Sequence, residues 1–406
     1  MRTVDDGMRI YFAPCGIALG HAGRCIPVAK TFVRRGHDVY FSTYGEAVPF
    51  VRKVGFQVGE VPAIKPFETE DGTFNIRRTF AHGPKDLMTF SYQVGDELNL
   101  IEHFKPDLVI SDSRLSTVLG ARIMRIRPVL ILHQLRIMMP HLKPVLGNRA
   151  KLKRAFERTS LEVLGSMWKL SKVIIVPDFP PPYTIAKANV VPSNQYLKKI
   201  KLVGPIVPKY PEELPAAEEI KRNLGLNDRP LILAAISGTL AEKKLIAGKL
   251  TDIFKEFPDR YNIVLTRGLS EIPNPPDTQE MLNKRLRVYN WINDRYSYLK
   301  ACDILVTRGG HNTVAEAICF GKPMVVVPTP AHSEHQGIAE SIVKMGLGVS
   351  IQQQNLTKDE LLGGVESIAN STVFMEKVKD AQKFALRFNA IESIYRTVCD
   401  LLKVPY

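Results

Sequence analysis

The stretch from Cys302 to Ala339 holds the densest run of residues whose types and spacing could do chemistry. A short apolar run ends at Thr307, two glycines follow, and a helix is predicted to begin directly after them. Paired glycines allow a backbone to approach a ligand closely, and a helix N-terminus offers unpaired N–H groups with a partial positive charge. This arrangement suits a diphosphate. The residues expected to bind it are Gly309, Gly310, His311, Asn312 and Thr313.

Carboxylate and amide side chains nearby suit the hydroxyls of a sugar. Glu316 lies in the first turn of the predicted helix, where its carboxylate can accept the hydroxyls of a ribose. A second loop, residues 328–336, follows the next predicted strand and ends in Glu334-His335-Gln336. Because open α/β sheets bind ligands at the carboxyl ends of their strands, we expect both loops at one edge, with Glu334 and Gln336 available to a sugar.

The first half of the chain contributes a candidate base. His21 lies in a glycine-bearing loop, residues 14–27, and imidazole can take up a proton at neutral pH. A histidine in this position can also cap the following helix. Asp112 follows the apolar run PDLVIS, where it could orient His21, meet an acceptor or cap a helix. His133, at another predicted strand end, is a weaker candidate for the base and is expected to be satisfied by packing.

The elements that must position these residues alternate between short apolar strands and helices. Such alternation with short loops is typical of a doubly wound parallel sheet. Strands are predicted at 8–13, 38–42, 106–111, 128–132, 231–236, 262–266, 287–289, 303–307 and 323–328. Helices are predicted at 23–35, 117–125, 240–257 and 313–319.

The alternation is interrupted once, at residues 204–215. Their sequence, GPIVPKYPEELP, holds four prolines, which cannot continue a helix or a central strand, so it is interpreted as an interdomain linker. The chain is also too long for one compact core. We therefore predict two α/β domains, residues 1–203 and 216–385, that face a central cleft. Residues 386–406 form a predicted C-terminal helix that is a candidate to pack back on the first domain.

The segment from Asn290 to Ala339 resembles the nucleotide-sugar signature of GT-B glycosyltransferases. The resemblance is to the UDP-glucosyl and glucuronosyl transferases and to the lipid II N-acetylglucosaminyl transferases of family 28 type. The matching positions are Trp291-Ile292, Asp303, Gly309-Gly310, Thr313, Glu316-Ala317, Gly321-Lys322-Pro323, Pro328 and Gln336. One departure is present. The family's Asp-Gln pair followed by Asn-Ala is replaced here by the sequence EHQGIA, at residues 334–339.

The resemblance implies roles for the candidate donor-site residues. The residue matching Ile292 pairs with the base through its backbone, Glu316 holds the ribose, and the loop with Gln336 reads the sugar. The loop that touches the donor phosphates is matched by Ser237, Gly238 and Thr239. Arg267, after the next strand, could add a cation there or remain a solvated surface charge.

The resemblance also covers the N-terminal loop, which is similar to the glycine-rich loop that opens these enzymes. It implies that His21 is the general base and that Gly16, Gly20 and Arg24 belong to an acceptor loop. No Asp-x-Asp pair stands where it could hold a metal over a diphosphate, so we expect no metal and no cofactor beside a UDP-sugar co-substrate. The negative charge of the leaving diphosphate would be stabilised by oriented N–H groups, and the attack of the acceptor would invert the configuration at the anomeric carbon.

The net charge of +14 is concentrated in the first half of the chain. Residues 1–203 hold 30 basic and 17 acidic residues, whereas residues 204–406 hold 25 and 24. One basic half beside a neutral one indicates an anionic partner, such as nucleic acid, an acidic membrane surface or a phosphorylated substrate.

Residues 136–172 depart most from the average composition. They carry nine basic and two acidic residues, interleaved with large apolar ones at helical spacing. This pattern is typical of a helix that lies in the plane of an acidic membrane surface, although the apolar face could also pack on its own domain. Phe156 and Trp168 are the only aromatic residues in the segment, which disfavours stacking on nucleic acid.

Composition excludes several classes of protein. Apolar residues make up 45% and charged residues 24% of the chain, which is typical of a globular protein. No window approaches the roughly 18 apolar residues of a membrane span. Asp5 and Asp6 stand where a secretory signal would be cationic. Five scattered cysteines predict neither a disulfide framework nor a metal cage, and they favour a reducing, cytoplasmic location.

The leading hypothesis is an inverting, metal-independent glycosyltransferase that moves a sugar from a UDP-sugar to a lipid or lipid-linked acceptor. It would associate peripherally with the inner face of the cell membrane. Two alternatives stay open. A sugar-nucleotide epimerase would share the fold, but its additional acidic catalytic residues are not evident. A nucleic-acid-binding protein would use the basic half, but the apolar content of residues 136–172 fits lipid better.

Overall fold

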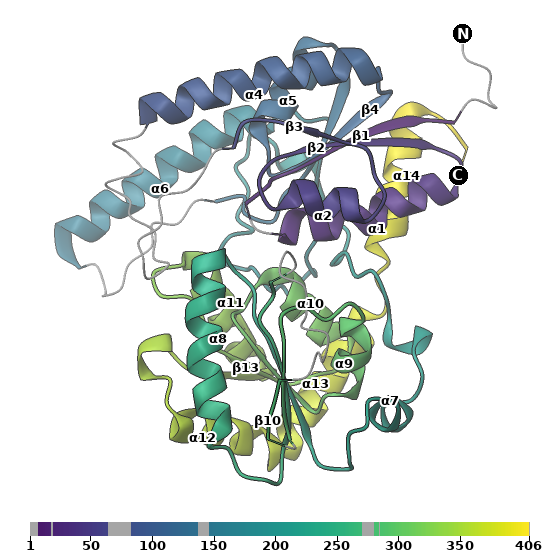
Figure 1. Ribbon diagram of the computed structural model, residues 1–406. Helices are drawn as coiled ribbons and strands as arrows, with labels where there is room; N and C mark the ends of the chain where they lie inside the picture. The colour runs from purple at the N-terminus through teal and green to yellow at the C-terminus, as the bar shows by residue number, and fades with distance from the viewer. Residues whose placement is uncertain are drawn as a thin grey trace.

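Two α/β domains lie one above the other, each built on its own sheet (Figure 1). The computed structural model describes residues 7–17, 19–63, 83–136, 146–269, 280–283 and 285–405. Asp5, Asp6 and residues 137–145 of the basic segment lie outside these ranges. The two sheets confirm the predicted class of two Rossmann-like domains. The predicted strands agree with the observed ones to within two residues at each end.

The N-terminal sheet has the order β3-β2-β1-β4-β5-β6-β7. Every pair of neighbouring strands is parallel. The strands are β1 (Arg9–Pro14), β2 (Asp38–Thr43), β3 (Val58–Glu60), β4 (Leu108–Asp112), β5 (Arg127–Ile131), β6 (Val173–Val176) and β7 (Ile200–Leu202). Helices cover both faces of such a sheet, so its central strands read as continuous apolar runs, and all five residues of β4 are buried.

The helices of this domain divide between the two faces of the sheet. They are α1 (Gly20–Arg34), α2 (Ala47–Lys53), α4 (Gly83–Phe104), α5 (Leu115–Ile123) and α6 (Gly147–Trp168). Side chains of α1 and α2 pack on one face, and those of α4 and α5 pack on the other. The helix α6 extends away from the side of the domain (Figure 1).

The C-terminal sheet has the order β10-β11-β9-β8-β12-β13-β14. Its strands are β8 (Leu231–Ala235), β9 (Asn262–Thr266), β10 (Glu280–Asn283), β11 (Leu286–Tyr289), β12 (Ile304–Thr307), β13 (Met324–Val326) and β14 (Gly348–Ser350). All neighbours are parallel except β10 and β11. The helices that cover this sheet are α7 (Ala217–Asn223), α8 (Leu240–Lys255), α9 (Arg295–Ala301), α10 (His311–Cys319), α11 (Ser333–Met345), α12 (Lys358–Ala369) and α13 (Thr372–Ala385).

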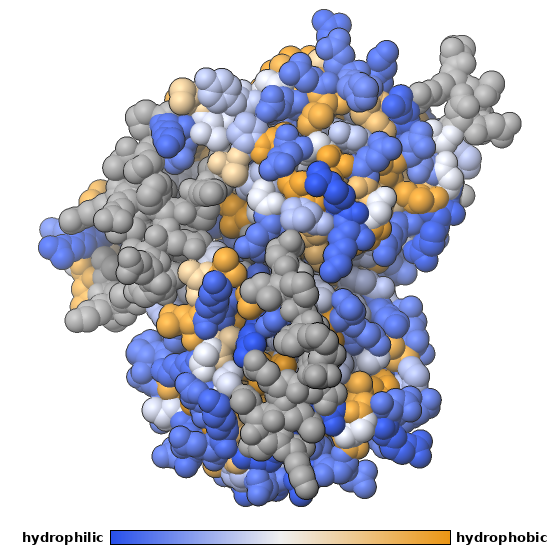
Figure 2. Space-filling model, viewed as in Figure 1, coloured by the Kyte–Doolittle hydropathy of each residue, from blue (hydrophilic) through white to orange (hydrophobic). Residues whose placement is uncertain are grey.

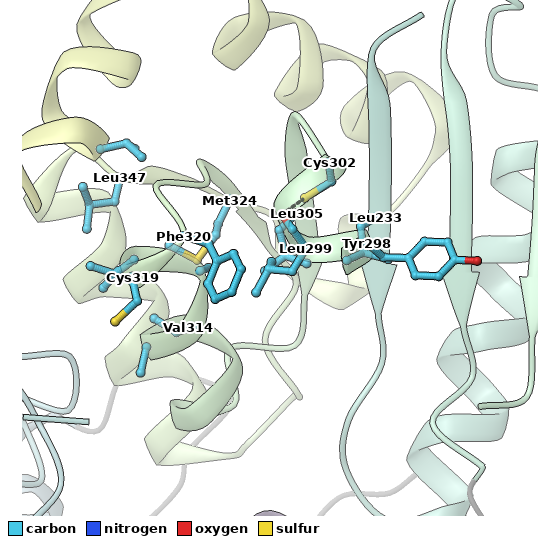
Figure 3. Close-up of a cluster of buried hydrophobic side chains, with 14 of the residues drawn as sticks. Leu233, Tyr298, Leu299, Cys302, Leu305, Val314, Cys319, Phe320, Met324 and Leu347 are labelled. Atoms are coloured by element: carbon cyan, nitrogen blue, oxygen red, sulfur yellow. Dashed lines mark hydrogen bonds between the residues drawn. The ribbon is translucent and has the colours of Figure 1, made fainter. Parts of the chain in front are cut away.

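The helix α10 is fixed in place by the core of the C-terminal domain. Figure 3 shows Val314 and Cys319 of α10, and Phe320 directly after it, among apolar side chains from β8, α9, β12 and β13. All three are at most 4% exposed. Burying a side chain of this kind contributes about 1.5–3 kcal/mol, so the start of α10 rests on a rigid support.

Each domain sends one segment into the core of the other. The last helix, α14 (Ala390–Leu402), lies against α1 in the N-terminal domain (Figure 1), where Ile394 and Val398 are fully buried. In the other direction, Phe179 and Ile185 follow β6 and are buried in the C-terminal core. The domains are therefore joined by interlocking apolar contacts in addition to the linker.

Candidate active site

A cleft of about 1000 Å³ lies between the two domains. Its N-terminal wall includes Gly20, Gly23 and Arg24 of α1, and its C-terminal wall includes Ser237 and Thr313. Both walls lie where strands β1, β8 and β12 end, at the carboxyl edges of the sheets. The cleft therefore occupies the position at which open α/β sheets bind their ligands.

The loop between β12 and α10 needs its two glycines. Gly309 adopts a positive φ of 82°, and a Cβ there would lie 3.1 Å from Val326 Cγ1. Gly310 is the N-cap of α10, and no side-chain cap is present among the described residues. The first-turn N–H groups of a helix have no partner within it, and Asn312 and Thr313 line the cleft. A partial positive charge therefore faces the cleft, as diphosphate binding requires.

The Ser237 hydroxyl is the second group that suits a phosphate oxygen. Its Oγ is shielded from solvent and has no hydrogen-bond partner among the described residues. It lies on the cleft wall, 3.1 Å from the position a Cβ on Gly310 would take. A shielded polar atom without a partner costs free energy, and a bound ligand can supply the missing partner.

The residues that follow Ser237 shape the turn into α8, although Gly238 also lines the cleft. Thr239 is the N-cap of α8: its backbone N–H donates to Glu242 Oε2 at 2.8 Å, and its hydroxyl faces Glu242 N. Gly238 adopts a φ of 128° to make this turn. Arg267 donates to Asn290 Oδ1 at 3.1 Å, whereas the following Gly268 lines the cleft. The structure therefore gives Thr239 and Arg267 contacts within the protein.

Glu316 is held at the cleft by two side chains that the sequence did not reveal. Its carboxylate, 3% exposed, accepts from Arg295 and from the Tyr296 hydroxyl, the latter at 2.9 Å. Burial raises the pKa of Glu316, and Arg295 offsets part of that effect. All three residues line the cleft, as does the buried Ile292. These contacts hold the carboxylate in one position at the cleft.

Beside the N-terminal wall of the cleft, His21 and Asp112 form a hydrogen-bonded pair, although neither is among the residues that line the cleft. His21 Nδ1 lies 2.7 Å from Asp112 Oδ1, so Nδ1–H donates and Nε2 is left to accept a proton. Arg24 clamps the same carboxylate through Nε and Nη2, both at 2.5 Å. Burial would raise the pKa of Asp112, but Arg24 and His21 outweigh it and hold that pKa well below the usual range. Asp112 therefore stays ionised and orients the imidazole.

The other expected acceptor-loop residues have different contacts. Gly16 packs on Tyr44, since a Cβ at that position would lie 2.0 Å from the Tyr44 carbonyl oxygen. The Gly20 carbonyl accepts from Asn312 Nδ2 at 2.9 Å, which joins the two walls of the cleft. Arg24 is 2% exposed and bound to Asp112, so it positions the candidate base rather than offering a free charge.

The loop expected to read the sugar is also engaged within the protein. Gln336 exchanges amide hydrogen bonds with Gln352, at 3.1 and 3.2 Å. Glu334 reaches the N-terminal domain, where its Oε1 accepts from His133 Nε2 at 2.8 Å. The His311 imidazole turns into the domain interface, with its Nε2 3.3 Å from Asp178 Oδ2.

His133 is satisfied by these contacts and is neutral at pH 7. Its Nδ1 accepts from Arg24 Nη1 at 2.7 Å while Nε2 donates to Glu334. Burial lowers its pKa to about 4, Arg24 adds to that effect, and Glu334 opposes it. His133 is therefore no free base.

The buried His133 is expected to make the protein less stable in acid. The unfolded chain binds the proton with a pKa of about 6.5, whereas the folded protein does so only near 4, so the unfolded state holds more protons between these values. The free energy of unfolding should thus fall as pH drops from 6.5 to 4, by on the order of 3 kcal/mol from this residue. Urea unfolding at several pH values measures the slope. His133→Gln should reduce it, and the exposed control His103→Gln should not; equal slopes in all three proteins would contradict the assignment.

Comparisons with known proteins agree with this geometry. A model of glycosyl transferase family 1 matches residues 8–193, and a model of the glycosyltransferase family 28 C-terminal domain matches residues 236–392. A Methanosarcina mazei protein named "Uncharacterized glycosyltransferase" is 25% identical over 388 residues, which is 95% of this chain and 97% of that protein. A UDP-N-acetylglucosamine--N-acetylmuramyl-(pentapeptide) pyrophosphoryl-undecaprenol N-acetylglucosamine transferase of Thermosipho africanus is 27% identical over 152 residues, 37% of this chain and 42% of that protein.

Solved structures show the same fold over the whole chain. The glycotransferase of kitacinnamycin has a TM-score of 0.65 at 17% identity, and the match covers 98% of this chain and 100% of that one. MurG of Acinetobacter baumannii has a TM-score of 0.59 at 17% identity, covering 98% and 99%. The family resemblance and the enzyme class predicted from the sequence are thus confirmed. The chain belongs to the GT-B glycosyltransferases, with a C-terminal domain of the family 28 type.

Proposed function

We propose that this glycosyltransferase moves a sugar from a UDP-sugar to a hydroxyl of a lipid or lipid-linked acceptor, with inversion and without a metal ion. The observation that carries the proposal is that the uncapped start of α10 lies at one wall of the cleft, while the His21–Asp112 pair lies beside the opposite wall, next to Gly20 and Arg24. The name of the Thermosipho africanus relative, which specifies UDP-N-acetylglucosamine and a pyrophosphoryl-undecaprenol acceptor, supports the donor and acceptor classes.

The geometry suggests how the groups would act. His21 Nε2 would take the proton of the acceptor hydroxyl as its oxygen bonds to the anomeric carbon. The bond from that carbon to the diphosphate oxygen would break on the opposite side, which inverts the configuration. The departing negative charge would meet the first-turn N–H groups of α10 and the Ser237 hydroxyl, already oriented before the reaction.

Ser237→Ala should weaken nucleotide binding without weakening the fold. The hydroxyl has no partner to lose in the unliganded protein, whereas a hydrogen bond to a charged phosphate contributes about 1.5–3 kcal/mol. The Kd for UDP, measured by calorimetry, should rise about tenfold or more, with the Tm unchanged or slightly higher. Ser350→Ala is the matched control, because its hydroxyl on β14 is also shielded and unpartnered but lies outside the cleft-lining set. A Kd equal to that of the wild type would show that Ser237 does not contribute to nucleotide binding.

The helix α6 supports a membrane-bound acceptor. Among its residues only Glu157, Gly165 and Trp168 are buried. Leu152 and Val163 are 72% and 55% exposed, and at 3.6 residues per turn their separation of eleven places them on one face. Hydrophilic and hydrophobic side chains stand side by side at the exposed end of α6, at the left edge of Figure 2. Among the described helices, none has the length and apolar content needed to cross a bilayer.

Docking of α6 on an acidic membrane predicts a specific loss on mutation. Val163→Glu should reduce co-sedimentation with phosphatidylglycerol vesicles about tenfold or more, since it removes an apolar contact and adds a repelled charge. Val373→Glu, on the C-terminal domain and 61% exposed, is the matched control and should bind as the wild type does. Equal binding by both variants, or preference for duplex DNA at the same salt, would contradict membrane docking through α6.

The donor is tested by thermal unfolding with UDP, GDP, dTDP and ADP, each with magnesium and with EDTA. A ligand at 100 times its Kd adds about 2.7 kcal/mol, which raises the Tm by several degrees. The proposal predicts that UDP gives the largest shift and that EDTA leaves it unchanged. A shift that requires magnesium would contradict the metal-independent mechanism, and no shift with any nucleotide would contradict the donor class.

A further inference from the structure

Two histidine rings, tilted by 31° to each other, are in contact where the domains meet, beside the candidate catalytic pair. His133 follows β5 in the N-terminal domain, His311 begins α10 in the C-terminal domain, and their ring centroids are 4.7 Å apart. Each pairs with a carboxylate from the opposite domain: His133 with Glu334 at 2.8 Å and His311 with Asp178 at 3.3 Å. The two pairs thus cross the interface in opposite directions.

Both carboxylates are held firmly in place. Asp178 is fully buried and accepts the backbone N–H groups of Phe179, Ile185 and Ala186 at 2.7 to 3.0 Å. Glu334 is 12% exposed and accepts from His133 through one oxygen and from Gln134 through the other. A buried carboxylate bound in this way has one favourable position, which fixes the approach of the two domains.

A chain of hydrogen bonds leads from Glu334 through His133 and Arg24 to the candidate catalytic pair. Because Glu334 accepts from Nε2–H, His133 keeps its Nδ1 lone pair for Arg24 Nη1, at 2.7 Å. The remaining Arg24 donors grip both oxygens of Asp112, and Asp112 Oδ1 accepts from His21 Nδ1–H. A change at Glu334 therefore removes the anchor of the His133 ring at Nε2 and loosens one of the contacts that fix Arg24.

The cleft lies on the other side of this chain of contacts. Of the residues in it, only Arg24 is among those that line the cleft, whereas Glu334, His133 and Asp178 lie in the interface. Both Glu334 oxygens are bound within the protein, to His133 and Gln134, so the structure gives this carboxylate a contact between the domains where the sequence favoured a sugar contact.

We propose that Glu334 is a positioning residue: it latches the two domains together in this arrangement, and through His133 and Arg24 it fixes the orientation of Asp112 and His21. The inference rests on the proposed function only in giving His21 its role as the base. The orientation of His21 then depends on contact between the two domains, because Glu334 belongs to the donor-binding domain.

The first test reads the histidine tautomers in the full chain labelled with ¹⁵N-histidine. In the wild type, His133 should be a single Nε2–H tautomer and His21 a single Nδ1–H tautomer. Glu334→Ala should shift the ring ¹⁵N signals of both residues, because His133 and Arg24 lose their fixed positions, although Glu334 does not touch His21. Glu334→Gln, whose amide oxygen can still accept from His133, should restore most of the wild-type pattern. Glu340→Gln, on the same helix in an exposed ion pair with Lys344, should change neither.

An unchanged His21 spectrum in Glu334→Ala would overturn the proposal, even if His133 changes. This measurement needs no substrate, so it tests the positioning role of Glu334 even if the protein binds no nucleotide and the proposed function fails. Where UDP-sugar turnover is measurable, Glu334→Ala should lower kcat by up to about 10²-fold, the size of loss that a small misplacement causes, with the donor KM within about twofold. A raised donor KM with kcat intact would indicate a sugar contact and would also overturn it.

Discussion

Replacing His21 with alanine should lower kcat for sugar transfer by about 10²–10⁴-fold, the range that a general base contributes. The imidazole is 22% exposed beside the cleft, and Asp112 holds Nδ1–H so that Nε2 can accept the acceptor proton. The residues around the proposed diphosphate site are untouched by the substitution, so the Kd for UDP should stay within about twofold of the wild-type value.

The measurement is the rate of UDP release from the UDP-sugar at saturating acceptor. His103→Ala, an exposed histidine on α4, is the control for loss of an imidazole outside the site. A His21→Ala enzyme with more than a tenth of the wild-type kcat would show that another group takes the proton. Retained kcat in Asp112→Asn would likewise remove the role assigned to that carboxylate.

Replacing Arg24 with methionine should cost about 3–5 kcal/mol of unfolding free energy, because it leaves a buried carboxylate without its cation. Asp112 is fully buried, and Arg24 supplies two of its short hydrogen bonds as well as the bond to His133. The same change should reduce kcat, since Asp112 and His21 lose the group that fixes them.

Urea unfolding provides the measurement, with Arg34→Met as the matched control on the same helix. Arg34 is exposed and bonds only Thr31 among the described residues, so its loss should cost at most about 0.5 kcal/mol. Adding Asp112→Asn to Arg24→Met should recover much of the stability, because the uncompensated charge disappears. A loss below about 1 kcal/mol in Arg24→Met would contradict the buried ion pair.

The fold was predictable because its central strands are buried on both faces. Runs such as Leu231–Ala235 are apolar throughout, and the glycines and polar residues that follow them mark the carboxyl edge of each sheet. The strands β3, β6, β7, β10 and β14 have three or four residues and were not predicted, whereas β13, also of three residues, was recognised because a longer apolar run surrounds it. The order of the strands depends on contacts between distant segments, which periodicity does not record.

The candidate site was predictable only where backbone geometry decides it. The glycine pair before α10 and the position of Glu316 follow from local sequence; Glu316 lines the cleft, whereas the two glycines precede the lining residues Asn312 and Thr313 in the chain. The partners of Glu334 do not follow, because His133 stands 201 positions away and is reached only when the domains pack together. The hydrogen bonds between Gln336 and Gln352 could not be predicted either, because tertiary contacts, and not the motif, decide where the Gln336 amide points.

The central claim is that the cleft between the domains binds the nucleotide of the donor. Hydrogen–deuterium exchange of the full chain with and without saturating UDP tests it most directly. The account predicts slower exchange in two places: the start of α10, residues 309–316, and the loop after β8, residues 236–239, whose groups face the cleft. Unchanged exchange in both segments under conditions where UDP binds would place the nucleotide elsewhere and contradict the account.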